Sequence, residues 1–243
     1  MQIDILTLFP SLFDSVFSQS ILKKAVDKKI VKIKITDIRD FAEGKHKIVD
    51  DKPYGGGAGM IMMVPPVVKA VESVRCKIYL TTVGRVKNKN EKIILLSPQG
   101  KVFNQKKAKE LSKYKHLIFV CGHYGGVDER VLKFVDEEIS IGDYVLTGGE
   151  IPTMAVVDAV VRILPKVVAK SDSIKNDSHW IGGLASSVYT RPYNFRNLKV
   201  PEVLLSGNHK KIEKWRGENA RQNTLSKRPE LLKNREVHAK QNT

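Results

Sequence analysis

Cysteine is scarce in this 243-residue chain, and its two cysteines, Cys76 and Cys121, stand far apart with no CxxC pair. Disulfides and a cysteine zinc site are therefore not expected, and a reducing, cytoplasmic location is favoured. The six histidines show no spacing typical of metal ligands. The glycine patterns of dinucleotide-binding and P-loop proteins are also missing, which argues against a phosphate-rich nucleotide as ligand.

Long apolar runs and acidic side chains are also in short supply. No uncharged run approaches the roughly 18 residues of a membrane span. The first residues, MQIDILTLFP, include Asp4 and no basic leader, so no signal peptide is expected. Only 26 Asp and Glu face 42 Lys and Arg, which leaves a formal charge of +16. This charge predicts a polyanionic partner such as nucleic acid, although a generally basic surface without a partner would give the same value.

Apolar residues recur with strand and helix spacing along the first two thirds of the chain. Strands are expected at 3–9, 31–35, 78–80, 93–96, 117–121 and 139–141, and helices at 11–27, 65–75, 104–114 and 151–164. The connections are too long for hairpins, so the pattern predicts an α/β domain with a parallel sheet. The helix at 151–164 is apolar almost all round, which predicts burial on more than one side and a subunit interface.

The composition changes after Pro165. Residues 169–178 are polar and lack apolar periodicity, which predicts a flexible linker between a first domain at 1–168 and a second at 179–243. The second domain contains an expected helix from Lys210 to about Asn219, which follows the capping sequence Ser-Gly-Asn. The Lys and Arg side chains of this helix, together with Trp215, form a basic face that suits contacts with RNA.

The segment 117–150 has the strongest pattern of a ligand site. Its apolar run at 117–121 suits a strand buried on both faces. A glycine-rich turn follows at 122–126, and further turns are expected at 142–143 and 148–149. Glycine allows positive φ and close backbone approach at such turns, but each turn by itself is equally compatible with an ordinary α/β connection.

A turn is also expected at 97–100, where the preceding strand ends. The carboxyl ends of adjacent parallel strands meet at one edge of a sheet, so we expect these turns to form one pocket. Asp143 and Glu150 disfavour an anion and suit a neutral heterocycle with a positive centre, such as S-adenosylmethionine or a similar ligand. The glycine-rich loop at 50–60 is interpreted as a flap on the substrate side, with a flexible spacer as the alternative.

Six motifs, in this order, resemble those of the bacterial tRNA (guanine-N1)-methyltransferases, knotted enzymes of the SPOUT class that modify the guanosine 3′ of the anticodon. They are DDKPYGGG at 50–57, LSPQG at 96–100, GVDER at 126–130, IGDYVLTGGE at 141–150, YTRP at 189–192 and LSGNH at 205–209. The resemblance runs through almost the whole chain. It implies a SPOUT-type parallel sheet with a deep trefoil knot, a small helical C-terminal domain, and a homodimer with its active site at the subunit interface. It also implies tRNA as substrate, S-adenosylmethionine as methyl donor and a requirement for Mg²⁺.

The same resemblance implies roles for individual residues. Asp177 matches the general base for the N1 proton of guanine, and its spacing to Tyr189 distinguishes it from Asp172. Arg162 matches an arginine that would stabilise negative charge on O6. The cofactor-binding residues implied are Pro98, Gly122, Ile141, Gly142, Asp143, Tyr144, Val145, Leu146, Gly148 and Gly149.

Three positions depart from the family pattern. His123 and Gly125 stand where the family usually has Arg and Glu, and Leu95 stands where it has an aromatic residue. No substrate role is therefore placed on Gly125. Two alternatives stay open: an RNA-binding SPOUT-like protein with little or no catalysis, and a generic basic binding module, which would explain the charge but not the glycine turns.

Overall fold

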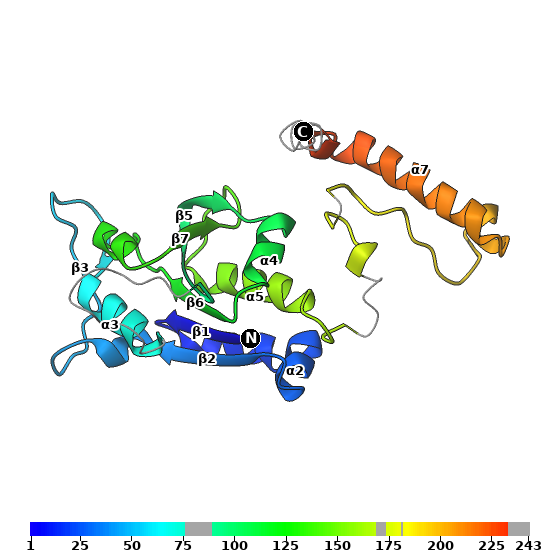
Figure 1. The fold of residues 1–243 in the computed structure, drawn as a ribbon. Helices are drawn as coiled ribbons and strands as arrows, with labels where there is room; N and C mark the ends of the chain where they lie inside the picture. The colour runs from blue at the N-terminus through cyan, green and yellow to red at the C-terminus, as the bar shows by residue number, and fades with distance from the viewer. Residues whose placement is uncertain (76–88, 169–173, 181, 233–243) are drawn as a thin grey trace. The chain divides into compact units, whose positions relative to one another are not determined.

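A computed structural model describes residues 1–75, 89–168, 174–180 and 182–232 (Figure 1). The chain divides into two compact units, Met1–Ala169 and Lys170–Thr243. The strand expected at 78–80 and the first half of the expected linker lie outside the described residues. Within the described residues, no helix combines the length and the apolar character needed to cross a membrane.

The first unit is built on a five-stranded sheet in which every neighbouring pair is parallel. The strands are β1 (Gln2–Thr7), β2 (Lys32–Asp37), β5 (Glu91–Val102), β6 (His116–Cys121) and β7 (Glu137–Ser140), in the order β2-β1-β6-β5-β7. The predicted α/β fold with a parallel sheet is thereby confirmed. β6 lies at the centre and is buried on both faces from Leu117 to Cys121, as its apolar run predicts.

Helices cover both faces of this sheet (Figure 1). They are α1 (Asp14–Phe17), α2 (Ser20–Asp27), α3 (Val64–Val74), α4 (Gln105–Leu111) and α5 (Glu150–Arg162). Side chains alternate along a strand. Leu117 and Phe119 of β6 therefore pack in one cluster with α2, α4 and α5, whereas Ile118 and Val120 pack in another with α3.

The helix predicted at 11–27 was wrong as a single element. The chain forms a 3₁₀ helix, η1 (Pro10–Phe13), followed by the short α1 and then α2. The interruption occurs where Gln19 is extended and Ser20 has a φ of 55°, a left-handed conformation that a continuous right-handed helix excludes.

The turn predicted at 97–100 is a bulge within β5 and does not end that strand. Leu96 and Lys101 both pair with Ile139 of β7, so the residues between them leave the ladder and the strand then rejoins it. Gly100 makes this possible, because a Cβ there would overlap the backbone of residues 138 and 139. The bulge carries Ser97, Pro98 and Gln99 out at the carboxyl edge of the sheet.

The second unit is organised on α7 (His209–Lys227), which continues eight residues beyond the end predicted at Asn219. The predicted cap is confirmed, since Asn208 Oδ1 accepts a hydrogen bond from the Lys211 amide at 3.2 Å. Before α7 come a hairpin of β8 (Asn194–Phe195) and β9 (Leu198–Lys199) and the 3₁₀ helix η4 (Glu202–Leu205). Residues 174–177, where the polar pattern predicts no regular structure, form a helical turn.

Lys107 of α4 belongs to a charge cluster at the edge of the sheet. Its Nζ lies 2.6 Å from Glu137 Oε1, and Lys92 Nζ lies 3.2 Å from the other oxygen of that carboxylate. Burial works against the charge of Glu137, but the hydrogen bonds from Lys107 and Lys92 outweigh it and lower the pKa of Glu137. The ion pairs join α4 and β5 to β7, so they stabilise the edge of the sheet.

A second buried charge cluster lies at the amino edge of the sheet. His116, at the start of β6, has only 13% of its side chain exposed, and its Nε2 lies 2.7 Å from Asp4 Oδ2 on β1. Its Nδ1 lies 3.1 Å from Glu91 Oε2 on β5. Burial alone would lower the pKa of His116, but the two carboxylates outweigh burial and raise it to about 9. A protonated His116 therefore bridges three adjacent strands.

This cluster makes stability depend on pH. The pKa of His116 is raised to about 9 in the folded chain against about 6.5 unfolded. Its contribution is therefore complete below about pH 6.5 and is lost as the pH rises to 9, with an upper limit of about 3 kcal/mol. We expect the difference in unfolding free energy between the parent and His116→Gln to shrink by up to that amount between pH 6 and 9.5, as measured by denaturant unfolding. The matched change at exposed His46 should show no such trend, and a pH-independent effect of His116→Gln would contradict the prediction.

Candidate functional site

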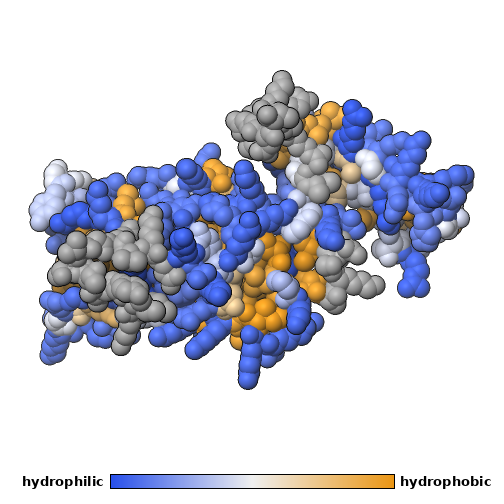
Figure 2. Space-filling model, viewed as in Figure 1, coloured by the Kyte–Doolittle hydropathy of each residue, from blue (hydrophilic) through white to orange (hydrophobic). Residues whose placement is uncertain are grey.

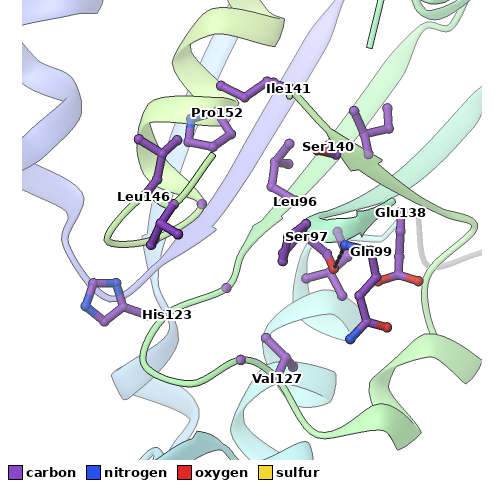
Figure 3. A pocket seen from close by; sticks show the side chains of 18 of the residues that line it. Leu96, Ser97, Gln99, His123, Val127, Glu138, Ser140, Ile141, Leu146 and Pro152 are labelled. Atoms are coloured by element: carbon purple, nitrogen blue, oxygen red, sulfur yellow. Dashed lines mark hydrogen bonds between the residues drawn. The ribbon is translucent and has the colours of Figure 1, made fainter. Parts of the chain in front are cut away.

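A cavity of about 320 Å³ opens at the carboxyl edge of the sheet. Its walls come from three segments: the β5 bulge, the loop after β6 and the loop after β7. Because β6, β5 and β7 are neighbours, the three segments converge at one place (Figure 3). The prediction that the turns share one pocket is confirmed, and the volume is in the range of small-molecule sites.

The cavity has an apolar side and a polar side. Figure 3 shows Leu146 and Pro152 on one side, with Gln99 and Glu138 together on the other. Glu138 belongs to β7, where its neighbour Glu137 points the opposite way into the ion pairs with lysine. This arrangement can hold a ligand with an apolar surface and hydrogen-bond donors or a positive charge.

Glycine is required where the loops approach one another. A Cβ on Gly149 would lie 2.8 Å from Cys121 Cα and 2.8 Å from the Gly122 nitrogen, closer than any side chain permits. The Gly149 amide donates to the Gly122 carbonyl at 2.7 Å, which ties the two loops together. In the turn after β6, only Gly126 among the predicted glycines has positive φ, at 130°, while Tyr124 also takes a positive φ of 59°.

The GVDER motif positions a carboxylate at the cavity. Asp128 accepts from the Arg130 amide at 2.9 Å and forms a two-bond pair with the Arg130 guanidinium, at 2.9 and 2.8 Å. This guanidinium lowers the pKa of Asp128. The pair fixes the start of the 3₁₀ helix η3 (Glu129–Lys133). Glu129, which lies between Asp128 and Arg130 in the sequence, belongs to the cavity wall.

A buried carboxylate lies beside the cavity at the start of α5. Glu150 is 3% exposed, and its Oε1 accepts from Thr7 Oγ1 at 2.8 Å. Its Oε2 lies 3.7 Å from His123 Nδ1, an atom that is itself buried without a hydrogen-bond partner among the described residues. Glu150 thus joins the end of β1 to the cavity loops, and His123, on its other side, belongs to the cavity lining.

Cys121, at the end of β6, is not a nucleophile. Burial raises the pKa of its thiol far above the usual range. The Sγ lies 3.2 Å from Thr153 Oγ1 on α5, so the side chain packs between strand and helix. Covalent catalysis through this cysteine is therefore excluded.

The glycine-rich loop is fixed at its base to the cavity. β3 (Asp50–Asp51) pairs with β4 (Ile61–Met62), and backbone bonds of 2.9 to 3.0 Å join residues 60–62 to residues 125, 126 and 128. This places the loop interpreted as a flap beside the cavity. At Gly125, one of the three positions that depart from the family pattern, a Cβ would lie 3.1 Å from the Met60 carbonyl oxygen. The base of the glycine-rich loop therefore lies directly against this position.

The structure brings nearly all of the predicted cofactor residues together. Pro98, Gly122, Ile141, Gly142, Tyr144, Val145, Leu146, Gly148 and Gly149 line the cavity. Asp143 is exposed and does not line it. Glu150 also lies outside the lining, so the acidic side chains at the cavity are Glu129 and Glu138, which the sequence reasoning missed.

Neither of the two predicted catalytic residues belongs to the lining of this cavity. Arg162 is the last residue of α5, ten residues after the cavity residue Pro152, a rise of about 15 Å along the helix. Asp177 is an exposed residue of the second unit.

A signal for the missed residues was present. Gln99 belongs to the LSPQG motif, and Glu137-Glu138 stand at the head of a strand, where alternation sends one carboxylate to each face. Leu95, the third departure, is buried and also lines the cavity. The family pattern drew attention to glycines, whereas these side chains decide the polarity of the wall.

Comparison with known proteins gives one consistent result. The family model described as tRNA (Guanine-1)-methyltransferase TrmD matches residues 1–234. The chain is 52% identical over 232 residues to the tRNA (guanine-N(1)-)-methyltransferase of Dictyoglomus turgidum, covering 96% of this chain and 90% of the relative. It is 52% identical over 241 residues to the protein of the same name from Shouchella clausii, covering 99% and 95%. With the protein of that name from Carboxydothermus hydrogenoformans it is 53% identical over 234 residues, covering 96% and 88%.

The backbone approach at Gly149 can be tested by adding one methyl group. We expect Gly149→Ala to lower the free energy of unfolding by about 1–3 kcal/mol, because Cβ would press on the rigid backbone of residues 121 and 122. Gly217→Ala is the control, because that position lies inside α7 with no atom near its Cβ, and alanine there should be stabilising by up to about 1 kcal/mol. Denaturant unfolding measures both, and equal stability of Gly149→Ala and the parent would refute the close approach.

Proposed function

This chain belongs to the tRNA (guanine-1)-methyltransferase family, and we propose that it methylates N1 of the guanosine immediately 3′ of the anticodon in tRNA, with S-adenosylmethionine as donor. The observation that carries the proposal is the cavity where the loops of three adjacent parallel strands converge. Its lining includes nine of the ten residues that the family resemblance assigns to the cofactor.

The chemistry of the lining supports S-adenosylmethionine as the ligand. When bound, this group supplies an electrophilic methyl on a positively charged sulfur. Leu146 and Pro152 offer an apolar wall for an adenine ring, and the carboxylates of Glu129 and Glu138 favour a cationic over an anionic ligand.

We assign the proton transfer to Asp177 and charge stabilisation to Arg162. As the bond from N1 of guanine to the methyl carbon forms and the bond from that carbon to sulfur breaks, the N1 proton passes to the Asp177 carboxylate. A carboxylate with a reference pKa of about 3.9 is a weak base for this proton. The guanidinium of Arg162 compensates by stabilising the negative charge that develops on O6.

We propose that these residues reach the cavity in a homodimer, with the active site at the subunit interface. The position of Arg162 at the far end of α5 from Pro152 supports this, since one chain leaves it remote from its own cavity. Figure 2 shows an apolar area over α5, and Ile151 in its first turn is 53% exposed. A second copy of the chain would cover such an area.

The knot and the domain arrangement are also proposals. A trefoil knot of the SPOUT type would explain why the β5 bulge approaches β7, and the loop after β7 approaches the end of β6, so closely that Gly100 and Gly149 have no room for Cβ. We divide the chain into a knotted methyltransferase domain at 1–168, a linker at 169–178 and a tRNA-binding helical domain at 179–243. The basic side chains of α7 suit a tRNA partner. A tRNA substrate and the small number of cysteines both support our proposal of a cytoplasmic location.

The described residues offer no clear binding site for Mg²⁺. Among the residues that the structure describes, no group of three or more His, Cys, Asp or Glu side chains is placed to hold a metal ion. We therefore assign no protein ligand to Mg²⁺ and route no step of the methyl transfer through it. A requirement for the ion stays a prediction.

The reaction predicts one product. Incubating the protein with S-adenosylmethionine and a tRNA transcript that has guanosine 3′ of the anticodon should yield 1-methylguanosine at that position, as measured by nucleoside mass spectrometry. A transcript with adenosine there is the control and should give none. Binding of tRNA without any 1-methylguanosine, and without calorimetric binding of S-adenosylmethionine, would favour the non-catalytic RNA-binding alternative.

The proposed base gives a sharper test. Asp177→Ala should reduce methyl transfer about 10²- to 10⁴-fold, because the N1 proton loses its acceptor. Calorimetry should show unchanged binding of S-adenosylmethionine, since Asp177 does not belong to the cavity lining. Asp172→Ala, in the same polar segment, should behave like the parent, and normal turnover by Asp177→Ala would remove that residue from its role.

A further inference from the structure

A second cavity, of about 400 Å³, lies entirely within the second unit and has no part in the proposed methyl transfer. Its walls come from the loop at 187–193, from Val200 and η4, and from one side of α7. The volume is in the range of sites that hold one small organic group. The cavity is therefore a candidate binding site in its own right.

Hydrogen bonds hold the walls in place without a ligand. The Ser187 amide donates to Asn219 Oδ1 of α7 at 2.7 Å, and Asn223 Nδ2 donates to Ser187 Oγ at 3.3 Å. At the other end of the loop, the Val200 amide donates to the Tyr193 carbonyl at 3.0 Å and closes the β8–β9 hairpin. A preformed site loses little conformational entropy when it binds.

Exposed aromatic and apolar side chains line this cavity. Tyr193 is 44% exposed, and Tyr189 is half exposed with its ring centroid 6.4 Å from that of Trp215. Leu205 of η4 adds an exposed apolar surface. Partly exposed phenol rings such as these are suited to stacking on a planar group such as a nucleobase.

Two guanidinium groups accompany the aromatic side chains. Arg191 and Arg216 line the cavity and are exposed, and among the described residues neither is paired with a carboxylate. α7, which carries Arg216, has six Lys and Arg against two Glu along its length. The cavity thus combines stacking surfaces with positive charge, a combination that matches a base and its phosphates rather than an acidic peptide or a lipid.

We infer that this cavity binds one unpaired nucleotide of the RNA substrate, its base against Tyr189 and Tyr193 and its phosphates near Arg191 and Arg216. The inference rests on the proposed function for the identity of the RNA as tRNA. It assigns to the second unit a base-stacking site for a nucleotide that is not methylated. This site acts in addition to the general attraction between the positive charge of the unit and the RNA backbone. Tyr193 is a binding residue in this scheme and takes no part in methyl transfer.

Matched aromatic variants of the full-length protein test the inference. Tyr193→Ala should raise the Kd for a tRNA transcript about 5- to 150-fold, because one stacked base loses its partner. Tyr193→Phe, which keeps the ring, should bind as the parent does. The control is Phe195→Ala: Phe195 is 58% exposed on β8, two residues away, but does not line the cavity. Fluorescence anisotropy at fixed salt measures Kd, and circular dichroism checks that each variant is folded.

The outcomes separate this inference from the proposed function. A Kd for Tyr193→Ala equal to that of the parent, or equal to that of Phe195→Ala, would overturn the nucleotide site even if 1-methylguanosine is formed. A change in oligomeric mass with unchanged Kd would overturn it too, by identifying the cavity as a subunit contact. Selective weakening by Tyr193→Ala without 1-methylguanosine from the parent would support the nucleotide site and refute the methyl transfer.

Discussion

The contact between the backbone at Gly149 and the end of β6 is the constraint on which the rest of the cavity depends. A hydrogen bond of 2.7 Å joins the Gly149 amide to the Gly122 carbonyl, and no Cβ fits between the two segments. Because the loop after β7 is held there, α5 begins directly behind it. Glu150 is then buried against Thr7, which connects the loop to the end of β1. A single close approach thus fixes the cavity wall, the helix and the neighbouring strand together.

The two edges of the sheet use charge differently. At the amino edge, His116 forms ion pairs with two carboxylates on the neighbouring strands β1 and β5. On the outer strand β7, Glu137 forms ion pairs with Lys92 and Lys107. These charges are paired within the fold and stabilise it. At the carboxyl edge, Glu129, Glu138 and His123 border a cavity instead. Polar groups that face a cavity remain available to a ligand, which is why the chemistry is assigned to that edge.

Two of the residues that depart from the family pattern, Gly125 and His123, lie in the turn after β6. Gly125 donates its amide to the Met60 carbonyl at 2.9 Å, so the backbone of the cavity loop and the base of the glycine-rich loop are in direct contact. A side chain at this position would press on that contact. His123 lies between Phe9 and Tyr124, with ring centroids at 4.7 and 5.0 Å. Gly125 therefore lies where the two loops meet and His123 belongs to the same turn, whereas Leu95, the third of these residues, lies on β5.

The sequence by itself determined the parallel α/β sheet, the buried central strand at 117–121 and the convergence of the glycine turns, because these follow from local periodicity and from the rule that parallel strands end at one edge. It also indicated the family, through motifs that match along nearly the whole chain. It did not reveal the break at Ser20, the bulge that returns β5 to β7, or the ion pairs of Lys107. Nor did it show that Glu138 faces the cavity while Asp143 does not. Those features depend on which backbone segments come within a few ångströms of one another, and contacts between residues distant in the chain are decided by tertiary packing, which no local pattern encodes.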